Sequence, residues 1–201
     1  GIHVVWRDDI PGNNEIFYKR SSDGGATWSS PVRMTWNSGW SESPSIAANP
    51  GSLIHVMWHD SSLGYSQILY KRSLNSGATW STLKRLTWNT GISYRPAVAA
   101  DSSNAVHVVW EDNLYGNYEL LYKKSIDGGA AWSGVTRLTW NSEGSHRADI
   151  ALDSANGVHL VWYNYISGNA EIFYKRSTNG GAAWSAPTRL TWNSGLSRNP
   201  S

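Results

Sequence analysis

Apolar and polar residues alternate along this chain in a pattern that returns every 52 residues. The clearest copies are IHVVW, IHVMW, VHVVW and VHLVW, which end at Trp6, Trp58, Trp110 and Trp162. Short runs rich in β-branched and aromatic residues predict strands, and the surrounding Gly, Asn, Ser and Thr disfavour helices. A fixed period of this size predicts tandem copies of one supersecondary unit, which bury their apolar faces against neighbouring copies.

Within the third copy, the pattern predicts four short strands joined by polar turns. We expect these strands at residues 97–101, 106–110, 119–123 and 136–140. Four antiparallel strands in a unit of this length are typical of a β-propeller blade. The expected fold is therefore an all-β propeller of four-stranded antiparallel blades. We divide its four repeats at the second-strand starts into residues 1–52, 53–104, 105–156 and 157–201.

The chain begins at the second strand of its first repeat, without an initiator methionine. Most of the innermost strand that should precede Gly1 is missing, and only its expected start is found, at residues 199–201. We therefore expect an incomplete propeller in a mature or excised chain. Because an unpaired strand edge is a site of association, we hypothesise that a second copy of the chain or a longer parent array completes the ring.

The composition argues against several classes of partner. The 17 Lys and Arg residues nearly balance the 15 Asp and Glu residues, so the net charge of +2 gives no reason to expect nucleic-acid binding. No apolar run approaches the roughly 20 residues that span a bilayer, so membrane insertion is not expected. The chain has no cysteine, whereas 13 Trp and 10 Tyr against 2 Phe suit both small repeated cores and sugar-binding surfaces.

The turn expected between the third and fourth strands carries a known pattern. Residues 21–28, SSDGGATW, resemble the Asp-box, or bacterial neuraminidase repeat, whose pattern is Ser-x-Asp-x-Gly-x-Thr-Trp. Across the other three copies, Asn replaces Asp twice and Ala replaces Thr twice. The matching residues are Ser21, Asp23, Gly25, Trp28, Ser73, Asn75, Gly77, Trp80, Ser125, Asp127, Gly129, Trp132, Ser177, Asn179, Gly181 and Trp184.

We interpret these turn residues as structural. Aspartate or asparagine hydrogen-bonds to nearby backbone N–H groups, glycine supplies a positive φ, and tryptophan fills the sheet as an apolar plug. The resemblance covers the whole chain and implies a sialidase-type β-propeller, in which Asp-boxes lie far from the active site. We expect a secreted or cell-surface protein.

The repeats differ most on the face opposite these turns. The loops there carry aromatic, arginine, histidine and carboxylate side chains, where neutral drift would leave mostly small polar residues and lysine. Loops on a rigid scaffold are where binding residues collect. We predict a ligand-binding face made of Arg7, Trp40, Glu42, His59, Tyr65, Tyr94, Arg95, Glu111, Tyr115, Tyr118, His146, Arg147, Tyr163, Tyr165 and Arg198.

Two polar positions recur in every repeat. One carries His3, His55, His107 and His159. The other carries Asp8, Asp60, Asp112 and Asn164. A residue required in every unit fits a packing role with a satisfied N–H, or a loop cap, better than a metal site. No spaced carboxylate loop indicates calcium, and we expect neither a metal nor a cofactor.

Three functions remain open. The first is non-catalytic recognition of carbohydrate, because aromatic faces stack on sugar rings, polar side chains bind hydroxyls, and repeated pockets add avidity. The second is a sialidase-like glycoside hydrolase, whole or in part. The third is a protein-binding or purely structural scaffold.

For a hydrolase, the resemblance implies an arginine cluster that binds a sugar carboxylate, a tyrosine nucleophile assisted by glutamate, and an aspartate acid/base. Arg95 and Arg147 lie near innermost-strand starts, and Tyr163 or Tyr165 with Glu111 could form the nucleophile pair. However, Arg198 is one position out of register, and the family's Arg-Ile-Pro segment is absent. Because catalysis needs one asymmetric constellation and the four repeats are so alike, we assign no catalytic residue and favour recognition.

Overall fold

Fifteen strands form four antiparallel sheets in the computed structural model of the protein, which describes residues 1–201. The first sheet contains β1 (Ile2–Asp8), β2 (Glu15–Ser21) and β3 (Val32–Arg33). The second contains β4 (Ser41–Ala48), β5 (Ile54–Asp60), β6 (Gln67–Ser73) and β7 (Lys84–Arg85). The third contains β8 (Ser93–Ala100), β9 (Val106–Asp112), β10 (Glu119–Ser125) and β11 (Thr136–Arg137). The fourth contains β12 (Ser145–Leu152), β13 (Val158–Ile166), β14 (Asn169–Ser177) and β15 (Thr188–Arg189).

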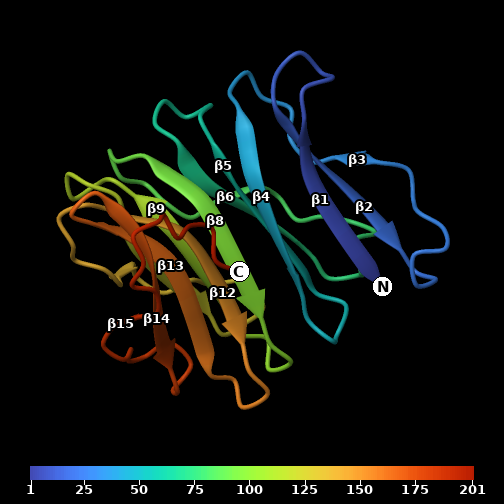
Figure 1. Cartoon of the computed structure of the whole chain (residues 1–201). Helices are drawn as coiled ribbons and strands as arrows, with labels where there is room; N and C mark the ends of the chain where they lie inside the picture. The colour runs from blue at the N-terminus through green and yellow to red at the C-terminus, as the bar shows by residue number, and fades with distance from the viewer.

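Each sheet is a meander in which consecutive strands pair. β4, β8 and β12 lie next to one another, and the sheets fan out in chain order from blue to red in Figure 1. This is the arrangement of propeller blades. The first sheet has three strands rather than the four expected of a complete blade, and the array does not close into a ring (Figure 1). The chain offers no helix with the length and apolar character needed to cross a membrane.

The core lies between successive sheets. Trp58, Trp110 and Trp162 are fully buried, and Trp110 packs with Ile68 and Leu86 of the preceding sheet. No sheet covers the corresponding face of β1, so Val4 is 40% exposed whereas its repeat equivalent Val56 is fully buried. The strand that carries the recurrent tryptophan is therefore buried by the stacking of one sheet on the next and not by pairing within its own sheet.

The four strands of the third sheet all begin or end at residues other than those predicted, and β9 and β10 each extend two residues further, to Asp112 and Ser125. β8 begins at Ser93 instead of residue 97, because a bulge between Tyr94 and Ala97 interrupts the alternation that the prediction relied on. The last strand, predicted over 136–140, is only Thr136–Arg137. The segment that follows Arg137 is still hydrogen-bonded to β10 through a side chain, since the Thr139 hydroxyl accepts the backbone N–H of Leu120 at 2.9 Å.

A buried carboxylate joins each of the two middle sheets to the sheet before it. Oδ2 of Asp60 accepts hydrogen bonds from the Trp58 indole (3.3 Å), the Ser41 hydroxyl (2.7 Å) and the Asn37 amide (2.9 Å). These donors come from a second strand, an innermost strand and the end of the preceding sheet. Asp112 accepts the same three kinds of donor in the next sheet.

Hydrogen bonding also sets the charge state of the buried Asp60 carboxylate. Burial alone would raise the pKa of Asp60, but hydrogen bonds from Ser62, Ser41 and Asn37 outweigh burial and hold the pKa below its ordinary value. Oδ1 of Asp60 caps its loop by accepting the backbone N–H of Ser62 at 2.9 Å, which confirms the loop cap predicted at this position. Asp60 is therefore an ionised joint between sheets.

The recurrent histidines have the packing role predicted for them. In every sheet Nδ1 of the histidine lies 2.7–2.8 Å from the hydroxyl of a tyrosine on the neighbouring strand. His55 and His107 are buried, and burial lowers the pKa of each imidazole to about 4. Both rings are therefore neutral in the folded protein at neutral pH.

Replacing Asp60 by alanine should lower the free energy of unfolding by about 3 kcal/mol, because three buried donors lose their acceptor. Asp60→Asn should cost only about 1 kcal/mol, since one acceptor oxygen remains. The fourth sheet offers the precedent, because Asn164 accepts the Trp162 indole N–H at 2.7 Å. Urea denaturation at neutral pH measures both values. An equal loss of stability in the two variants would contradict the role of Asp60 as the acceptor that joins the two sheets.

Acid should destabilise the fold through His55 and His107. The unfolded imidazoles titrate near about 6.5, whereas the folded ones stay neutral to about pH 4, so the unfolded chain binds protons first. The stability that the neutral rings contribute is complete above about pH 6.5 and is lost as the pH falls towards 4. NMR titration of the imidazole Hε1 signals checks this, and folded-state titration near the ordinary value would refute it.

Candidate functional site

One inter-sheet contact recurs along the edge where the second strands end. The side chain after the recurrent tryptophan of one sheet touches a side chain 35 residues further along the chain, which lies on the innermost strand of the next sheet in three cases and in the C-terminal segment in the fourth. We call these eight side chains the rim row. Its four contacts are Arg7 with Glu42, His59 with Tyr94, Glu111 with His146, and Tyr163 with Arg198.

The same geometry carries four different chemistries. Arg7 and Glu42 form an ion pair, and the rings of His59 and Tyr94 meet edge to face at 4.8 Å. The Glu111 carboxylate lies 3.0 Å from His146 Nδ1. The Arg198 guanidinium lies 6.0 Å from the ring centroid of Tyr163, in cation–π contact. The scaffold therefore holds the position constant while the sequence changes what is presented there.

Aromatic rings extend the rim row into a continuous surface over the third and fourth sheets. Tyr118 lies 6.1 Å from Tyr94 and 5.5 Å from His146, between ring centroids. His146 lies 5.4 Å from Tyr163, which meets Tyr165 edge to face at 5.7 Å. The Tyr165 hydroxyl accepts a hydrogen bond from Arg198 at 2.8 Å. Rings from two sheets are thus close enough to form one platform.

Glu111 is the buried centre of this surface, with 1% of its side chain exposed. It accepts hydrogen bonds from Arg95 Nη1 at 3.2–3.3 Å and from the backbone N–H of Arg147 at 2.9 Å, in addition to its contact with His146. Burial alone would raise the pKa of Glu111, but the hydrogen bonds from His146 and Arg147 and the charge of Arg95 outweigh it and lower the pKa. Glu111 is therefore an ionised anchor with both oxygens occupied.

A bulge near the start of β4, β8 and β12 orients the neighbouring positions, and Asn199 of the C-terminal segment has the same backbone conformation as the bulged residues. Ser43, Arg95, Arg147 and Asn199 have φ between 47° and 54°. Left-handed backbone at a non-glycine residue costs about 1 kcal/mol or more and gathers at functional sites. Arg95 and Arg147 occupy this position on the adjacent strands β8 and β12, and Arg147 is exposed with a guanidinium that makes no hydrogen bond or ion pair within the chain.

Three predicted face residues lie outside this surface. Trp40, Tyr65 and Tyr115 are exposed, and the side chain of none of them makes a hydrogen bond, ring contact or cation–π contact with the rim row. Tyr115 instead stacks with Arg137 of an outer strand, at 4.3 Å from the guanidinium to the ring centroid. The loops that carry these residues extend beyond the strand ends, so their position in the sequence does not fix where their side chains lie.

One residue of the surface was missed by the sequence analysis. Asn14 donates a hydrogen bond to Glu42 Oε1 at 2.6 Å and so helps to orient that carboxylate. It occupies the repeat position of Tyr118, which the analysis included. The equivalence of the two repeat positions could have identified Asn14, but the prediction favoured large aromatic and charged side chains.

The turns that resemble Asp-boxes lie at the opposite ends of the strands, since Ser21 pairs with Ile2 and Glu15 with Asp8. Ser21 Oγ accepts the Gly25 N–H at 2.9 Å, and Asp23 Oδ1 accepts the Thr27 N–H at 2.9 Å. The hydrogen bonds from Thr27 lower the pKa of Asp23 far below its ordinary value.

Three of these turns also touch the preceding sheet. Trp80 meets Tyr18 edge to face at 4.9 Å, and the other two turns repeat this contact at 5.3 Å. A Cβ on Gly77, which has a φ of 80°, would lie 1.9 Å from the Tyr18 hydroxyl, so only glycine fits there. These contacts support the structural interpretation of the turns.

Glu111→Ala should lower the free energy of unfolding by about 3 kcal/mol, because Arg95 and His146 lose a buried partner. Glu42→Ala is the matched control and should cost about 1 kcal/mol or less, since its partner Arg7 is largely exposed. Chemical denaturation measures both. Equal losses would show that Glu111 is not the anchor of the rim row.

Comparison with known proteins places the fold. No protein-family model and no curated protein matches the sequence. Among solved structures, the chain resembles the intramolecular trans-sialidase of Ruminococcus gnavus in complex with oseltamivir carboxylate. The two are 12% identical with a TM-score of 0.68, over 94% of this chain and 68% of that one.

Two further structures show the same likeness. The GH93 α-L-arabinofuranosidase of Fusarium graminearum is 19% identical, with a TM-score of 0.63 over 92% of this chain and 61% of that one. A mutant NanB sialidase of Streptococcus pneumoniae is 14% identical, with a TM-score of 0.63 over 94% of this chain and 49% of that one. The chain spans less than two thirds of the length of these two structures. At such identities the likeness concerns the fold alone, and that fold is the sialidase-type β-propeller.

Proposed function

We propose that this chain is a non-catalytic recognition module that binds carbohydrate on the surface built around the rim row. The observation that carries the proposal is the gathering of the half-buried rings of Tyr94, Tyr118, His146 and Tyr165 around the buried Tyr163, beside the exposed Arg147 and Arg198. Aromatic faces pack against the C–H groups of sugar rings, and arginine and histidine donate hydrogen bonds to sugar oxygens. An extracellular or cell-surface location suits such a role.

The chemistry of the surface argues against turnover. A tyrosine nucleophile needs a nearby base, and Glu111, the buried carboxylate within this surface, already accepts hydrogen bonds from three partners. Burial contributes most to raising the pKa of both Tyr118 and Tyr163 above the ordinary value of a tyrosine. A raised pKa makes the phenolate less available, and this is the reverse of what nucleophilic catalysis requires.

A sialidase-like hydrolase is the second candidate. Arg95 and Arg147 stand at equivalent positions of adjacent innermost strands, and the similar folds include sialidases. A guanidinium pair on one face suits a sugar carboxylate. This arrangement also fits recognition without cleavage, so turnover itself must decide between the two candidates.

A glycan array combined with a fluorogenic sialoside assay tests the proposal. We expect glycan binding without turnover, and a loss of binding by at least about tenfold in Arg147→Ala, since a charge-assisted hydrogen bond to the ligand would be removed. Lys19→Ala, a change on β2 outside the rim row, should leave binding unchanged. Turnover that disappears in Arg95→Ala would establish the hydrolase instead. Neither glycan binding nor turnover would leave a protein-binding or structural scaffold as the remaining function.

A further inference from the structure

A second surface, distinct from the rim row, is built from a tryptophan that the packing of the sheets does not explain. Trp36, Trp88 and Trp140 are 66%, 67% and 68% exposed. Trp192 occupies the same position in the last sheet, has no sheet beyond it, and is 70% exposed. The neighbouring sheet therefore covers almost none of the indole ring, and burial does not account for a tryptophan at this position of all four repeats.

The residues on either side of this tryptophan have clear structural roles. The Thr87 hydroxyl accepts the backbone N–H of Ile68 at 2.9 Å, and the Asn89 amide donates to Asp112 at 2.9 Å. The Trp88 side chain between them has no hydrogen-bond partner, and the cations Arg85 and Lys123 lie 5.9 Å and 5.5 Å from its ring centroid. The ring is a platform that the fold holds in place and leaves open.

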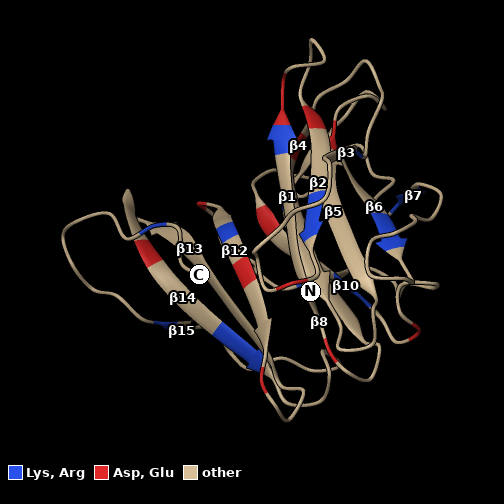
Figure 2. Ribbon diagram, turned by 90° about the vertical axis from the view of Figure 1, so that its right-hand side faces the viewer, with Lys and Arg blue, Asp and Glu red and all other residues tan.

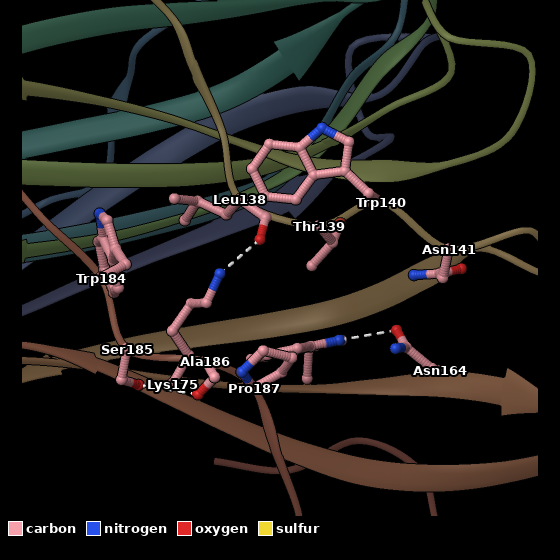
Figure 3. A pocket seen from close by; sticks show the side chains of 11 residues that line it. Leu138, Thr139, Trp140, Asn141, Asn164, Lys175, Trp184, Ser185, Ala186 and Pro187 are labelled. Atoms are coloured by element: carbon pink, nitrogen blue, oxygen red, sulfur yellow. Dashed lines mark hydrogen bonds between the residues drawn. The ribbon is translucent and has the colours of Figure 1, made fainter.

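Each of the first three such tryptophans borders a groove between two sheets. A lysine of the next sheet crosses the groove floor, as Lys175 does by donating to the Leu138 carbonyl at 2.7 Å beside Trp140 (Figure 3). The grooves that contain Trp36, Trp88 and Trp140 enclose about 230, 440 and 340 Å³. The latter two lie within the range of about 300–1,000 Å³ that is usual for small-ligand sites.

The groove at Trp88 differs from the others in charge. Arg33, Arg137 and Arg189 each form an ion pair with a glutamate of their own sheet, at 2.8–3.0 Å. The second sheet has Gln67 at that glutamate position, and the equivalent arginine, Arg85, forms no ion pair. A single substitution among the repeats thus leaves one guanidinium without a neutralising partner.

This difference makes the groove at Trp88 locally basic within a molecule of mixed charge. Acidic and basic residues are interspersed over the strands in the view of Figure 2. The groove, in contrast, is lined by Lys84, Arg85 and Lys123 and by no carboxylate. The grooves at Trp36 and Trp140 also lack a lining carboxylate, but each is lined by a single cation, Lys71 or Lys175, so an anionic ligand would be favoured most at the groove of Trp88.

We infer that the groove between the second and third sheets binds an acidic saccharide, a sugar that carries carboxylate or sulfate groups. Trp88 would stack on the C–H face of the ring, Arg85 would bind the anionic group with its free guanidinium nitrogens, and the lysines would donate to sugar oxygens. A membrane surface fits less well, because insertion of the tryptophan would strip water from cations that lie beside it in the groove. The site shares no residue with the rim row, so it goes beyond the function proposed above.

Titration calorimetry with trigalacturonate as the probe and neutral maltotriose as the comparison tests the inference. Trp88→Ala and Gln67→Glu should each weaken trigalacturonate binding by about tenfold or more, the second because it gives Arg85 the carboxylate that the other sheets possess. Trp192→Ala is the matched control and should leave binding unchanged. Gln67→Glu restores the repeat's own pairing and should therefore fold normally, which thermal unfolding checks.

Variants of the rim row separate this site from the one proposed above. In Arg147→Ala, trigalacturonate should still shift the indole N–H signal of Trp88 in ¹H–¹⁵N spectra, whereas any ligand bound at the rim row is lost. The inference is overturned if maltotriose binds as tightly as trigalacturonate, or if Trp88→Ala and Gln67→Glu both retain full affinity. Binding of phosphatidylserine vesicles that requires Trp88, without trigalacturonate binding, would also overturn it in favour of a membrane surface.

Discussion

Asp60 and Asp112 each gather hydrogen bonds from three segments of the chain onto one buried oxygen. The donors are the indole of the sheet's own tryptophan, the first residue of its innermost strand, and the asparagine that ends the preceding sheet. An ionised carboxylate is a stronger acceptor than a neutral one, and its charge would be costly in this position without those donors. The joint therefore fixes where one sheet meets the next and, with it, the spacing of everything displayed along that edge.

The rim row depends directly on this joint. His59 precedes Asp60 and Glu111 precedes Asp112, so each variable side chain is held beside a group that cannot move without breaking several buried hydrogen bonds. Constant positions provide the spacing, and the adjacent positions are free to change from an ion pair to an edge-to-face contact of two rings. This separation lets four nearly identical sheets present four different contacts. It also allows Glu111 to be fully satisfied inside the surface while Arg147 remains free to bind a ligand.

The grooves between the sheets likewise combine residues with a fixed packing role and a residue that the packing leaves open. Thr87 and Asn89 belong to the packing and the joint, and Trp88 between them is left open. Gln67 then alters the charge of one groove, because it replaces the glutamate that pairs with the equivalent arginine in the other sheets. Tandem repetition thus produces equivalent grooves, and a substitution outside the packing makes one of them different in charge.

The sequence by itself determined the repeat period, the strand-forming runs and the roles of residues that act locally. The histidine of each second strand could be interpreted because its tyrosine partner lies on the adjacent strand, and Asp8, Asp60 and Asp112 because the N–H group that each caps lies in the same loop. The bulge at Arg95 could not be predicted, because a positive φ at a non-glycine residue followed by proline interrupts the alternation that reveals strands. Only the tertiary structure decided that Glu111 meets His146, that Trp40 and Tyr65 stand apart, and that Arg85 lacks its carboxylate. Periodicity encodes how a strand alternates, whereas contacts 35 residues apart depend on how one sheet is stacked and rotated against the next.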